Sequence, residues 1–435
     1  MERYDRYKDS GIEWIGEIPE HWQVCRISCL FSEEKRINSN LDNYHALKFM
    51  DGTIVPKPEK WLKEDIEETY SKYRVVSPGT IMINNLNLNF DLKSKRVGIV
   101  LENGIITSAY LALVPDFNSV IPSFYNYVFK GWDSRKAFHG MGSGLRKTLN
   151  WEELSKHKVV HPLIKEQRVI AEYLDRKTFE IDSLVQKTEK SIELLQEYRK
   201  SVITEAVTKG LDPNVPMKDS GVEWIGKIPE EWNCFKLLYA LEMPITDGPH
   251  ETPVFYEQGI PFISADAIKN GKVDFSRMRG YISYEYHLSC SRKYSPKPGD
   301  IYMIKSGATT GQLGYVDFDG VFDIWSPLAA IRVNNGYSSK FLFYALSSDY
   351  FQKQVEEAWS FGTQQNLSMR KLEQLKVVFP KISVQHEIAN YLDSKIIKID
   401  SLIEKKKQLV EKLQEYRKSL ISECVTGKVK VPGVE

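Results

Sequence analysis

The sequence lacks most features of secreted, membrane or strongly basic proteins. Its 435 residues include five cysteines, none in a CxxC pair, and this small odd number suits free thiols in a reducing compartment. It shows no signal peptide and no apolar run long enough to cross a membrane, so we expect a soluble, cytoplasmic protein. The 59 lysines and arginines are balanced by 58 acidic residues, so any basic surface must be local.

Signatures of catalysis are also missing. The sequence has no Pro-Pro dipeptide, which excludes the Asn/Asp-Pro-Pro-aromatic strip with which amino-methyltransferases hold a flipped base. It has no G-x-x-x-x-G-K-[ST] loop to bind phosphates. Cys25 and Cys29 lack the second CxxC or His pair of a metal site, and His250 stands in a Gly/Pro turn without a nearby nucleophile. We therefore expect no catalytic residue, no metal site and no cofactor in this chain.

What the sequence does contain is one long stretch that occurs twice. Residues 159–210 and 377–428 align at an offset of 218 and share the segments IDSL and LQEYRKS. Most of each copy is free of proline and glycine, and its apolar residues fall three and four apart, which predicts one long helix with a coiled-coil stripe. About 40 residues at about 1.5 Å each give a helix of about 60 Å, too long to bury its stripe alone. Two such helices in one chain most simply pack against each other, antiparallel and related by a pseudo-two-fold.

The helical repeat also suggests a docking surface for a partner. The identical LQEYRKS segments, residues 195–201 and 413–419, suit two copies of one partner protein, with recent duplication as the alternative. The residues expected in the coiled coil and in partner docking are Ile181, Val185, Ile192, Leu195, Tyr198, Val202, Ile399, Ile403, Val410, Leu413, Tyr416 and Leu420.

A second repeat opens each half of the chain and predicts a packing plug at the start of a globular domain. Residues 8–22 and 218–232 share glycines, a proline and two tryptophans. Further on, Ser77–Ile83 corresponds to Lys297–Met303, and such short β-branched runs predict strands. The expected fold class is α/β (α+β), with two globular mixed α/β domains joined by the two long helices. The expected boundaries are a first domain over 1–160, a helix over 161–210, a second domain over 211–378, a helix over 379–428 and a tail over 429–435.

This order of motifs resembles a known family. The pattern P-x-x-x-x-E/Q-x-x-I-A-x-Y-L-D introduces each long helix, at Pro162–Asp175 and again from Pro380 to Asp393. Further matches are Lys297–Asp300, Asp247–Pro253 and Gly362–Ser368. The chain resembles, over essentially its whole length, the specificity subunit of type I restriction–modification systems.

The resemblance implies a non-catalytic reader of double-stranded DNA. Each globular domain would be a target recognition domain that reads one half of a bipartite, asymmetric site. The paired helices would act as a spacer and dock two modification subunits, which methylate adenine with S-adenosylmethionine. Two restriction subunits would join for translocation and cleavage with ATP and Mg²⁺.

Two polar loops carry side chains suited to reading DNA, and they differ between the halves. Asn and Gln pair with adenine and Arg or Lys with guanine in the major groove, while Lys, Arg, Ser and Thr contact phosphates. The alternative is that Asn, Gly and Ser mark surface turns in any protein. The candidates in the first domain are Asn84, Asn85, Asn87, Asn89, Lys93, Lys95, Arg96, Arg146 and Lys147, and those in the second are Lys305, Ser306, Thr309, Thr310, Gln312, Gln364, Gln365 and Asn366.

Two other classes of protein remain open at this point. The first is an autonomous nucleic-acid enzyme with a degenerate site, which S-adenosylmethionine binding by the purified chain would favour. The second is a coiled-coil scaffold that binds only protein, which salt-dependent DNA binding would exclude.

Overall fold

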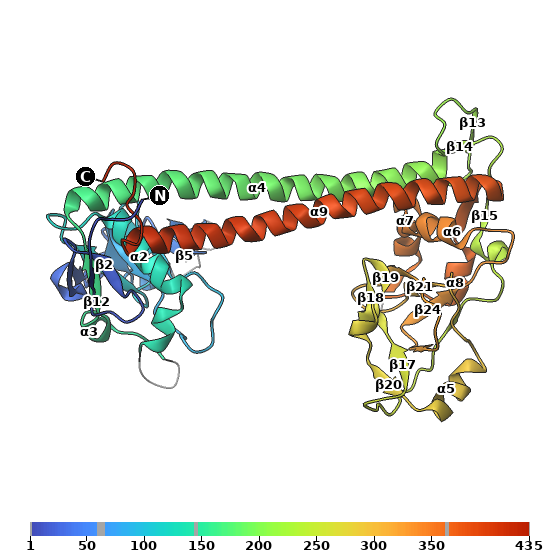
Figure 1. Cartoon of the computed structure of the whole chain (residues 1–435), viewed down its shortest axis with the longest axis horizontal. Coiled ribbons are helices and arrows are strands. Elements are labelled where there is room, and N and C mark those ends of the chain that lie inside the picture. The colour runs from blue at the N-terminus through green and yellow to red at the C-terminus, as the bar shows by residue number, and fades with distance from the viewer. Residues whose placement is uncertain (1, 59–65, 143–146, 362–364, 435) are drawn as a thin grey trace. The chain divides into compact units, whose positions relative to one another are not determined.

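The computed structural model describes all residues except 1, 59–65, 143–146, 362–364 and 435. The chain forms two compact units, Met1–Glu189 with Gln408–Glu435, and Lys190–Lys407. Two long helices, α4 (Ile164–Lys209) and α9 (Ile382–Val425), contribute residues to both units (Figure 1). Neither helix contains proline or glycine, and each is followed by a glycine with positive φ, Gly210 at +80° and Gly427 at +68°. Glycine adopts this left-handed conformation without steric penalty, which ends both helices where the repeat ends.

The first unit is built from small antiparallel sheets and short helices. Its largest sheet has the order β4-β11-β8-β9. The strands are β1 (Tyr7–Asp9), β2 (Glu17–Pro19), β3 (Gln23–Arg26), β4 (Phe31–Glu33), β5 (Leu47–Met50), β6 (Thr53–Pro56), β7 (Arg74–Val76), β8 (Ile81–Ile83), β9 (Val97–Ile99), β10 (Gly104–Ile106), β11 (Leu111–Pro115) and β12 (Lys158–His161). Besides α4, the helices are α1 (Ile66–Tyr70), α2 (Pro122–Ser134) and α3 (Trp151–Leu154).

The second unit has a larger sheet, of order β16-β24-β21-β22-β19-β18, beside a three-stranded sheet of order β20-β17-β23. In Figure 1, α6 and α7 lie between α9 and these sheets. The strands are β13 (Met217–Asp219), β14 (Lys227–Pro229), β15 (Asn233–Lys236), β16 (Thr246–Asp247), β17 (Ile260–Ile263), β18 (Ile268–Lys269), β19 (Gly271–Val273), β20 (Gly280–Ile282), β21 (Ile301–Ile304), β22 (Leu313–Tyr315), β23 (Asp323–Ile324), β24 (Leu328–Ile331), β25 (Ser360–Phe361), β26 (Gln365–Asn366) and β27 (Lys376–Phe379). The helices are α5 (Tyr284–Ser291), α6 (Ser339–Ser347), α7 (Asp349–Ala358) and α8 (Met369–Gln374).

The two units share one strand framework in the same register. In the first unit Met82 of β8 stands between Ala112 of β11 and Gly98 of β9. In the second unit Tyr302 of β21 stands in the same way between Ala330 of β24 and Gly314 of β22. A slip of one residue would turn every buried side chain of a strand to the opposite face, so this shared register is set by the same apolar pattern. The strands expected in both halves are therefore present, and α2 and α6 cover the framework in each unit.

The motif that introduces each long helix fastens it to its own domain through a buried glutamine. Gln167 accepts a hydrogen bond from the Ile121 N–H (2.9 Å) and donates one to the Pro162 carbonyl (2.9 Å). Gln385 accepts from the Ser338 N–H (2.9 Å) in the same manner. Ile121 and Ser338 are the N-cap residues of α2 and α6, so each glutamine satisfies a backbone donor at a helix start.

A tyrosine–aspartate pair fastens each long helix to its domain a second time, about two helical turns beyond the glutamine. The Tyr127 hydroxyl of α2 donates to Asp175 of α4 (2.8 Å), and the Tyr344 hydroxyl of α6 donates to Asp393 of α9 (2.6 Å). The last residue of the P-x-x-x-x-E/Q-x-x-I-A-x-Y-L-D pattern thus has a structural partner in both units.

The long helices pair antiparallel through equivalent contacts in the two units. Asp182 of α4 lies 2.8 Å from the Arg417 Nε of α9 in the first unit, and Asp400 of α9 lies 2.8 Å from the Arg199 Nε of α4 in the second. The offset of 218 converts one pair into the other. Apolar residues of both helices also enter the cores of both units. The expected fold class, mixed α/β domains joined by long antiparallel helices, is confirmed.

The opening repeat packs only in part as expected, because Trp224 of its second copy is 39% exposed. Trp22 and Trp232 are buried, each after a hairpin of equivalent register, β1–β2 and β13–β14. The first unit also holds both chain ends together, because Glu2 forms a β-bridge with Lys430 (Figure 1). Within the described part of the chain, no helix is long and apolar enough to span a membrane.

Candidate nucleic-acid interface

The polar loops predicted from sequence occupy the same position on the two frameworks. The first runs from β8 to β9 and the second from β21 to β22. Each is joined at its start to a later segment by an equivalent backbone bond, from Leu149 N–H to Asn85 C=O (3.1 Å) and from Leu367 N–H to Lys305 C=O (2.8 Å). We call residues 84–96 the first loop and residues 305–312 the second loop. The framework therefore presents two different loops from one structural site.

The first loop folds around a buried arginine. The Arg96 guanidinium is fully buried and donates to the carbonyl oxygens of Asn84 (2.9 Å), Leu86 (2.8 Å) and Asp91 (2.7 Å). Asn85 is also buried, and its amide donates to the Leu149 carbonyl (2.6 Å). Arg96 and Asn85, expected to contact DNA, thus support the loop from inside, because the Nη atoms of Arg96 and the Nδ2 of Asn85 donate to backbone carbonyls.

Other candidates of the first domain lie at the surface. Asn87, Asn89, Lys93, Lys95 and Lys147 are exposed, and Asn84 is half-buried. The Lys95 ammonium lies 2.8 Å from an Asp51 carboxylate oxygen, and the Asn84 side chain accepts a bond from the Leu86 N–H. Arg146 lies outside the described residues. The Leu88 N–H donates to the Lys147 carbonyl (3.1 Å), so the structure brings this lysine to the same loop.

Hydrogen bonds and burial also shift the pKa values of two aspartates in and beside the first loop. Contacts from Ser94, followed by those from Lys93, lower the pKa of Asp91 to about 2, so this carboxylate is ionised at neutral pH. Burial raises the pKa of Asp133, which accepts a bond from the Arg96 backbone N–H (2.7 Å).

The second loop is shorter and turns on glycine. Gly307 and Gly311 have φ values of +97° and +90°, which favour glycine over residues with a side chain. The Thr310 hydroxyl donates to the Gly307 carbonyl (2.7 Å), so this candidate stabilises the turn. Thr309 and Gln312 are exposed.

Ser306 and Asn366 come together in the second domain, because they form a β-bridge. Ser306 is half-buried and Asn366 is exposed. Gln364 lies outside the described residues, and so does the side chain of Gln365.

A buried carboxylate anchors the base of the second loop. Asp247 is 1% exposed, and its oxygens lie 3.0 Å from the Lys305 Nζ and 3.1 Å from the His250 Nε2. The Lys293 ammonium donates to its other oxygen (2.5 Å). Burial alone would raise the pKa of Asp247, but the two lysines lower it, so the group is ionised. Lys305 was expected to contact DNA, but its ammonium is paired with Asp247 and its side chain is only 13% exposed.

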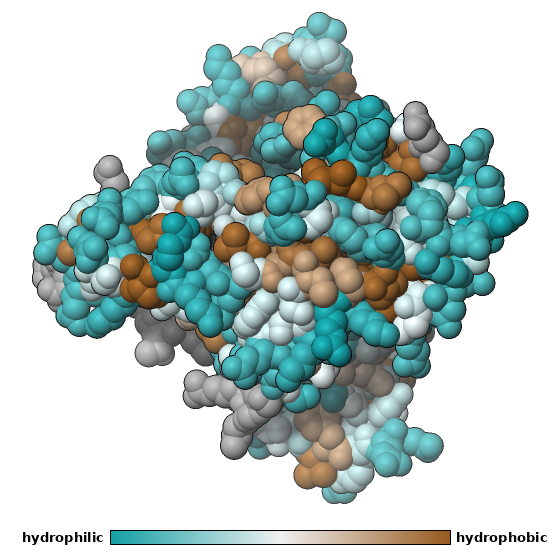
Figure 2. Space-filling view, turned by 90° about the vertical axis from the view of Figure 1, so that its left-hand side faces the viewer, coloured by the Kyte–Doolittle hydropathy of each residue, from teal (hydrophilic) through white to brown (hydrophobic). Residues whose placement is uncertain are grey.

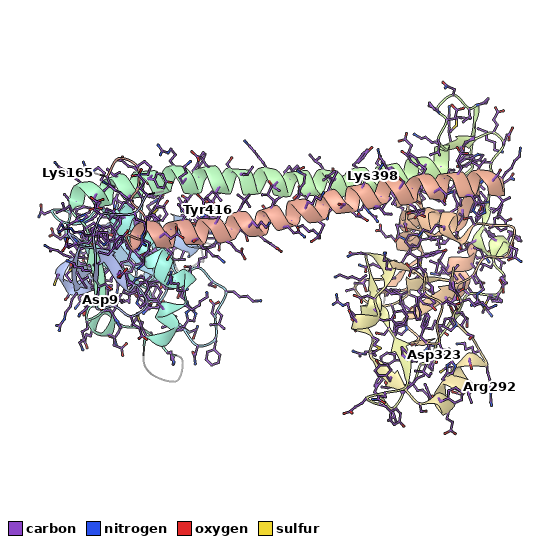
Figure 3. All side chains as sticks on the ribbon, viewed as in Figure 1. Asp9, Lys165, Arg292, Asp323, Lys398 and Tyr416 are labelled. Atoms are coloured by element: carbon purple, nitrogen blue, oxygen red, sulfur yellow. The ribbon has the colours of Figure 1, made fainter. Side chains whose placement is uncertain are left out.

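Two cavities of the second unit border this region. A cavity of about 120 Å³ beside Asp247 is lined by Lys293, Tyr294 and Asp323 among others. Figure 3 shows Arg292 at the end of α5 and Asp323 on the strand beside it. A groove of about 1110 Å³ reaches Thr310 and Gln312, and its lining includes five basic and six acidic residues. Its balanced charge does not suit a channel for phosphates.

The candidates on the long helices divide by burial. Ile181, Val202, Ile399, Ile403 and Leu420 are buried, Val185, Ile192, Leu195, Val410 and Leu413 are half-buried, and Tyr198 and Tyr416 are exposed. Figure 3 labels Tyr416 on α9. Exposed apolar residues recur at equivalent positions of the two helices, namely Phe179 and Ile397, Leu184 and Leu402, and Tyr198 and Tyr416. On the face of the first unit seen in Figure 2, apolar residues form small groups among polar ones.

Sequence reasoning did not include two kinds of residue in this region. Phe90 and Leu92 of the first loop are 73% and 58% exposed. The sequence shows Asp247 only as part of a motif. Its role as a buried anchor could not be predicted, because its partner Lys293 is 46 residues away. Within the described residues, no three His, Cys, Asp or Glu side chains converge to hold a metal ion.

Comparisons with known proteins show which proteins this chain is similar to. Residues 247–412 match the sequence model of the type I restriction modification DNA specificity domain. The fold is shared with a chain from a solved structure of the type I R-M system, with a TM-score of 0.71, 15% identity, and coverage of 95% of this chain and 99% of that chain. The HsdS subunit from Thermoanaerobacter tengcongensis gives a TM-score of 0.56 at 13% identity, covering 95% and 98%.

Sequence relatives agree over nearly the full length. The type I restriction enzyme MjaVIII specificity subunit of Methanocaldococcus jannaschii is 24% identical over 425 residues, 95% of this chain and 94% of that protein. The EcoKI specificity subunit of Escherichia coli is 19% identical, covering 95% and 90%. Residues 247–412 thus match a type I DNA specificity domain, and the resemblance of the whole chain to type I specificity subunits is confirmed.

Proposed function

We propose that the chain is a non-catalytic subunit that reads a bipartite DNA site through the first and second loops. The observation that carries this proposal is that one framework presents two chemically different loops from the same position, joined by equivalent backbone bonds. One of the two loops falls within the matched DNA specificity domain. Two different loops suit two different half-sites, and hence an asymmetric site.

The base contacts we propose are the candidates whose side chains reach the surface. In the first domain these are Asn87, Asn89 and Lys147, with Lys93 and Lys95 on phosphates, and in the second they are Thr309, Gln312 and Asn366. Asparagine and glutamine can pair with adenine in the major groove, and each good contact contributes about 1–3 kcal/mol of discrimination.

The helices are proposed to dock two modification subunits. The exposed residues Phe179 and Ile397, Leu184 and Leu402, and Tyr198 and Tyr416 place the same set of apolar contacts on both helices. The modification subunits would bring S-adenosylmethionine, and two restriction subunits would bring ATP and Mg²⁺. This chain would then contribute recognition and assembly but no reacting group.

Methylation mapping with loop variants tests this function. The full chain with its modification subunit is given a library of DNA sites, and methylated sites are sequenced. We expect N87A/N89A to relax one half-site by about tenfold or more and T309A/Q312A to relax the other, because each removes contacts of about 1–3 kcal/mol. Unchanged preference at both half-sites, or methyl transfer by the purified chain alone, would contradict the proposal.

A further inference from the structure

The Arg96 guanidinium organises residues 84–91 of the first loop. It is fully buried, and Nη1 and Nη2 together reach carbonyls at both ends of this segment, Asn84 and Leu86 on one side and Asp91 on the other. The Asn87 carbonyl lies 3.5 Å from Nη2. One planar group therefore gathers backbone oxygens from a segment of eight residues, 84–91, for which the structure shows no helix or strand.

Nearby charges make this burial tolerable. The Asp91 carboxylate lies 3.9 Å from the Arg96 Nη2, and the Arg96 backbone N–H donates to Asp133 (2.7 Å). A buried cation is costly unless it is paired and hydrogen-bonded, and here the three carbonyls and the Asp91 carboxylate supply that compensation to the guanidinium.

The geometry has a consequence for the outer face of the loop. When the carbonyls of Asn84, Leu86 and Asp91 point inward, the turn between them reverses at Asn87, which has a φ of +51°. Leu88 is buried below this turn, while Asn87 and Asn89 remain exposed. The direction in which these two amides project thus depends on the carbonyls being held.

We propose that Arg96 is the positioning residue of the first loop, setting its conformation and so the base preference of the first half-site without touching DNA. This inference rests on the proposed function, because it assumes that the exposed side chains of the loop meet bases. Arginine is suited to the task since its rigid fork carries five N–H donors, whereas the lysine ammonium is a single point with three. A lysine at position 96 keeps the charge but cannot span both sides of the loop.

The experiment compares R96K with R74K in the full chain assembled with its modification subunit. Arg74 is a matched control, because it is a buried arginine of the same domain whose guanidinium donates to the Tyr110 carbonyl (2.7 Å), outside the loop.

Methylated sites from a DNA library are sequenced, and amide hydrogen exchange of residues 84–91 is measured without DNA. We expect R96K to lose about tenfold of base discrimination at the first half-site, to keep the second half-site, and to exchange faster in the loop. R74K should leave both half-sites and the loop amides unchanged.

Each other outcome has a definite meaning. Unchanged preference and unchanged exchange in R96K would overturn the inference, and so would equal relaxation by R74K, because the effect would then be general loosening of the domain. If R96K yields no assembled complex, R96Q replaces it, since the neutral amide leaves no buried charge and still cannot span the carbonyls. If N87A/N89A leaves the first half-site unchanged, the proposed function of this loop fails. If that variant relaxes the half-site while R96K and R96Q do not, only the role of Arg96 fails.

Discussion

The first and second loops solve the same structural problem with different chemistry. Asn85 and Lys305 stand at equivalent positions, as do Arg96 and Gln312, because equivalent backbone bonds fix both places in each unit. In the first loop the arginine is buried among carbonyls, whereas in the second the glutamine is exposed and glycines make the turn. The comparison shows that the framework fixes only the ends of a loop. The path of the loop between those ends is determined by the side chains that pack inside it.

The two solutions also differ in what they depend on. The first loop is held by hydrogen bonds from Arg96 to backbone carbonyls, which are not titratable groups. The second rests on Lys305, whose ammonium contacts the carboxylate of Asp247 from the strand β16. Loss of one carboxylate should therefore disturb the second domain more than the first.

The largest effect is expected for D247A. It leaves Lys305, whose side chain is 13% exposed, without its counter-ion, and breaking a buried pair in this way costs about 3 kcal/mol. Urea unfolding followed by hydrogen exchange should show the loss in the second domain only. D247L/K305M, which removes both charges, should recover much of it. Equal destabilisation of both domains would contradict this expectation.

The same pair should make the second domain sensitive to acid. Because the pKa of Asp247 is lowered in the folded state, its contribution is present above the ordinary pKa of an aspartate, about 4, and is lost as pH falls through the lowered value. In D247L/K305M this part of the acid response should be absent, which unfolding measured between about pH 5 and pH 2 would test.

An intermediate effect is expected for F90A. The ring is 73% exposed, so its removal should leave stability unchanged, yet it stands beside Asn89 where an apolar group could contact a thymine methyl. We expect binding to weaken by about fivefold, about 1 kcal/mol, through the first half-site only. F117A, which removes a ring 60% exposed outside the loop, is the control and should bind normally. A similar loss in both variants would argue against a contact made by Phe90.

The smallest effects should be equal in the two units. The pairs Asp182–Arg417 and Asp400–Arg199 are partly exposed, so each should contribute about 0.5 kcal/mol and be screened by salt. Double-mutant cycles with alanine at both members of each pair would measure the two coupling energies. A clear difference between the two coupling energies would show that the two helices are not structurally equivalent at these positions, although their sequences are.

Local pattern explains what could be predicted from the sequence. The repeat predicted the long helices and the shared strands, because apolar spacing and the positions of glycine and proline are read along the chain itself. The inside of the loops could not be read in this way. Arg96 ends a basic run, Lys93 to Arg96, that looks like a surface for phosphates, and only the fold shows carbonyls gathered around it. Lys305 likewise looked free because Asp247 approaches it from a distant strand.

The buried glutamines have a consequence for how such chains can change. Gln167 and Gln385 hold their domains mainly through backbone N–H and C=O groups of Ile121, Pro162 and Ser338, with a further contact from the Gln167 Nε2 to the His161 Nδ1 (3.5 Å). A backbone group is the same in every sequence, so this part of the joint makes few demands on the residues it contacts, whereas the Tyr127–Asp175 and Tyr344–Asp393 bonds require a tyrosine in each domain. One domain could thus be exchanged for another of the same framework that keeps this tyrosine, with a new specificity, while the glutamine and its joint stay as they are.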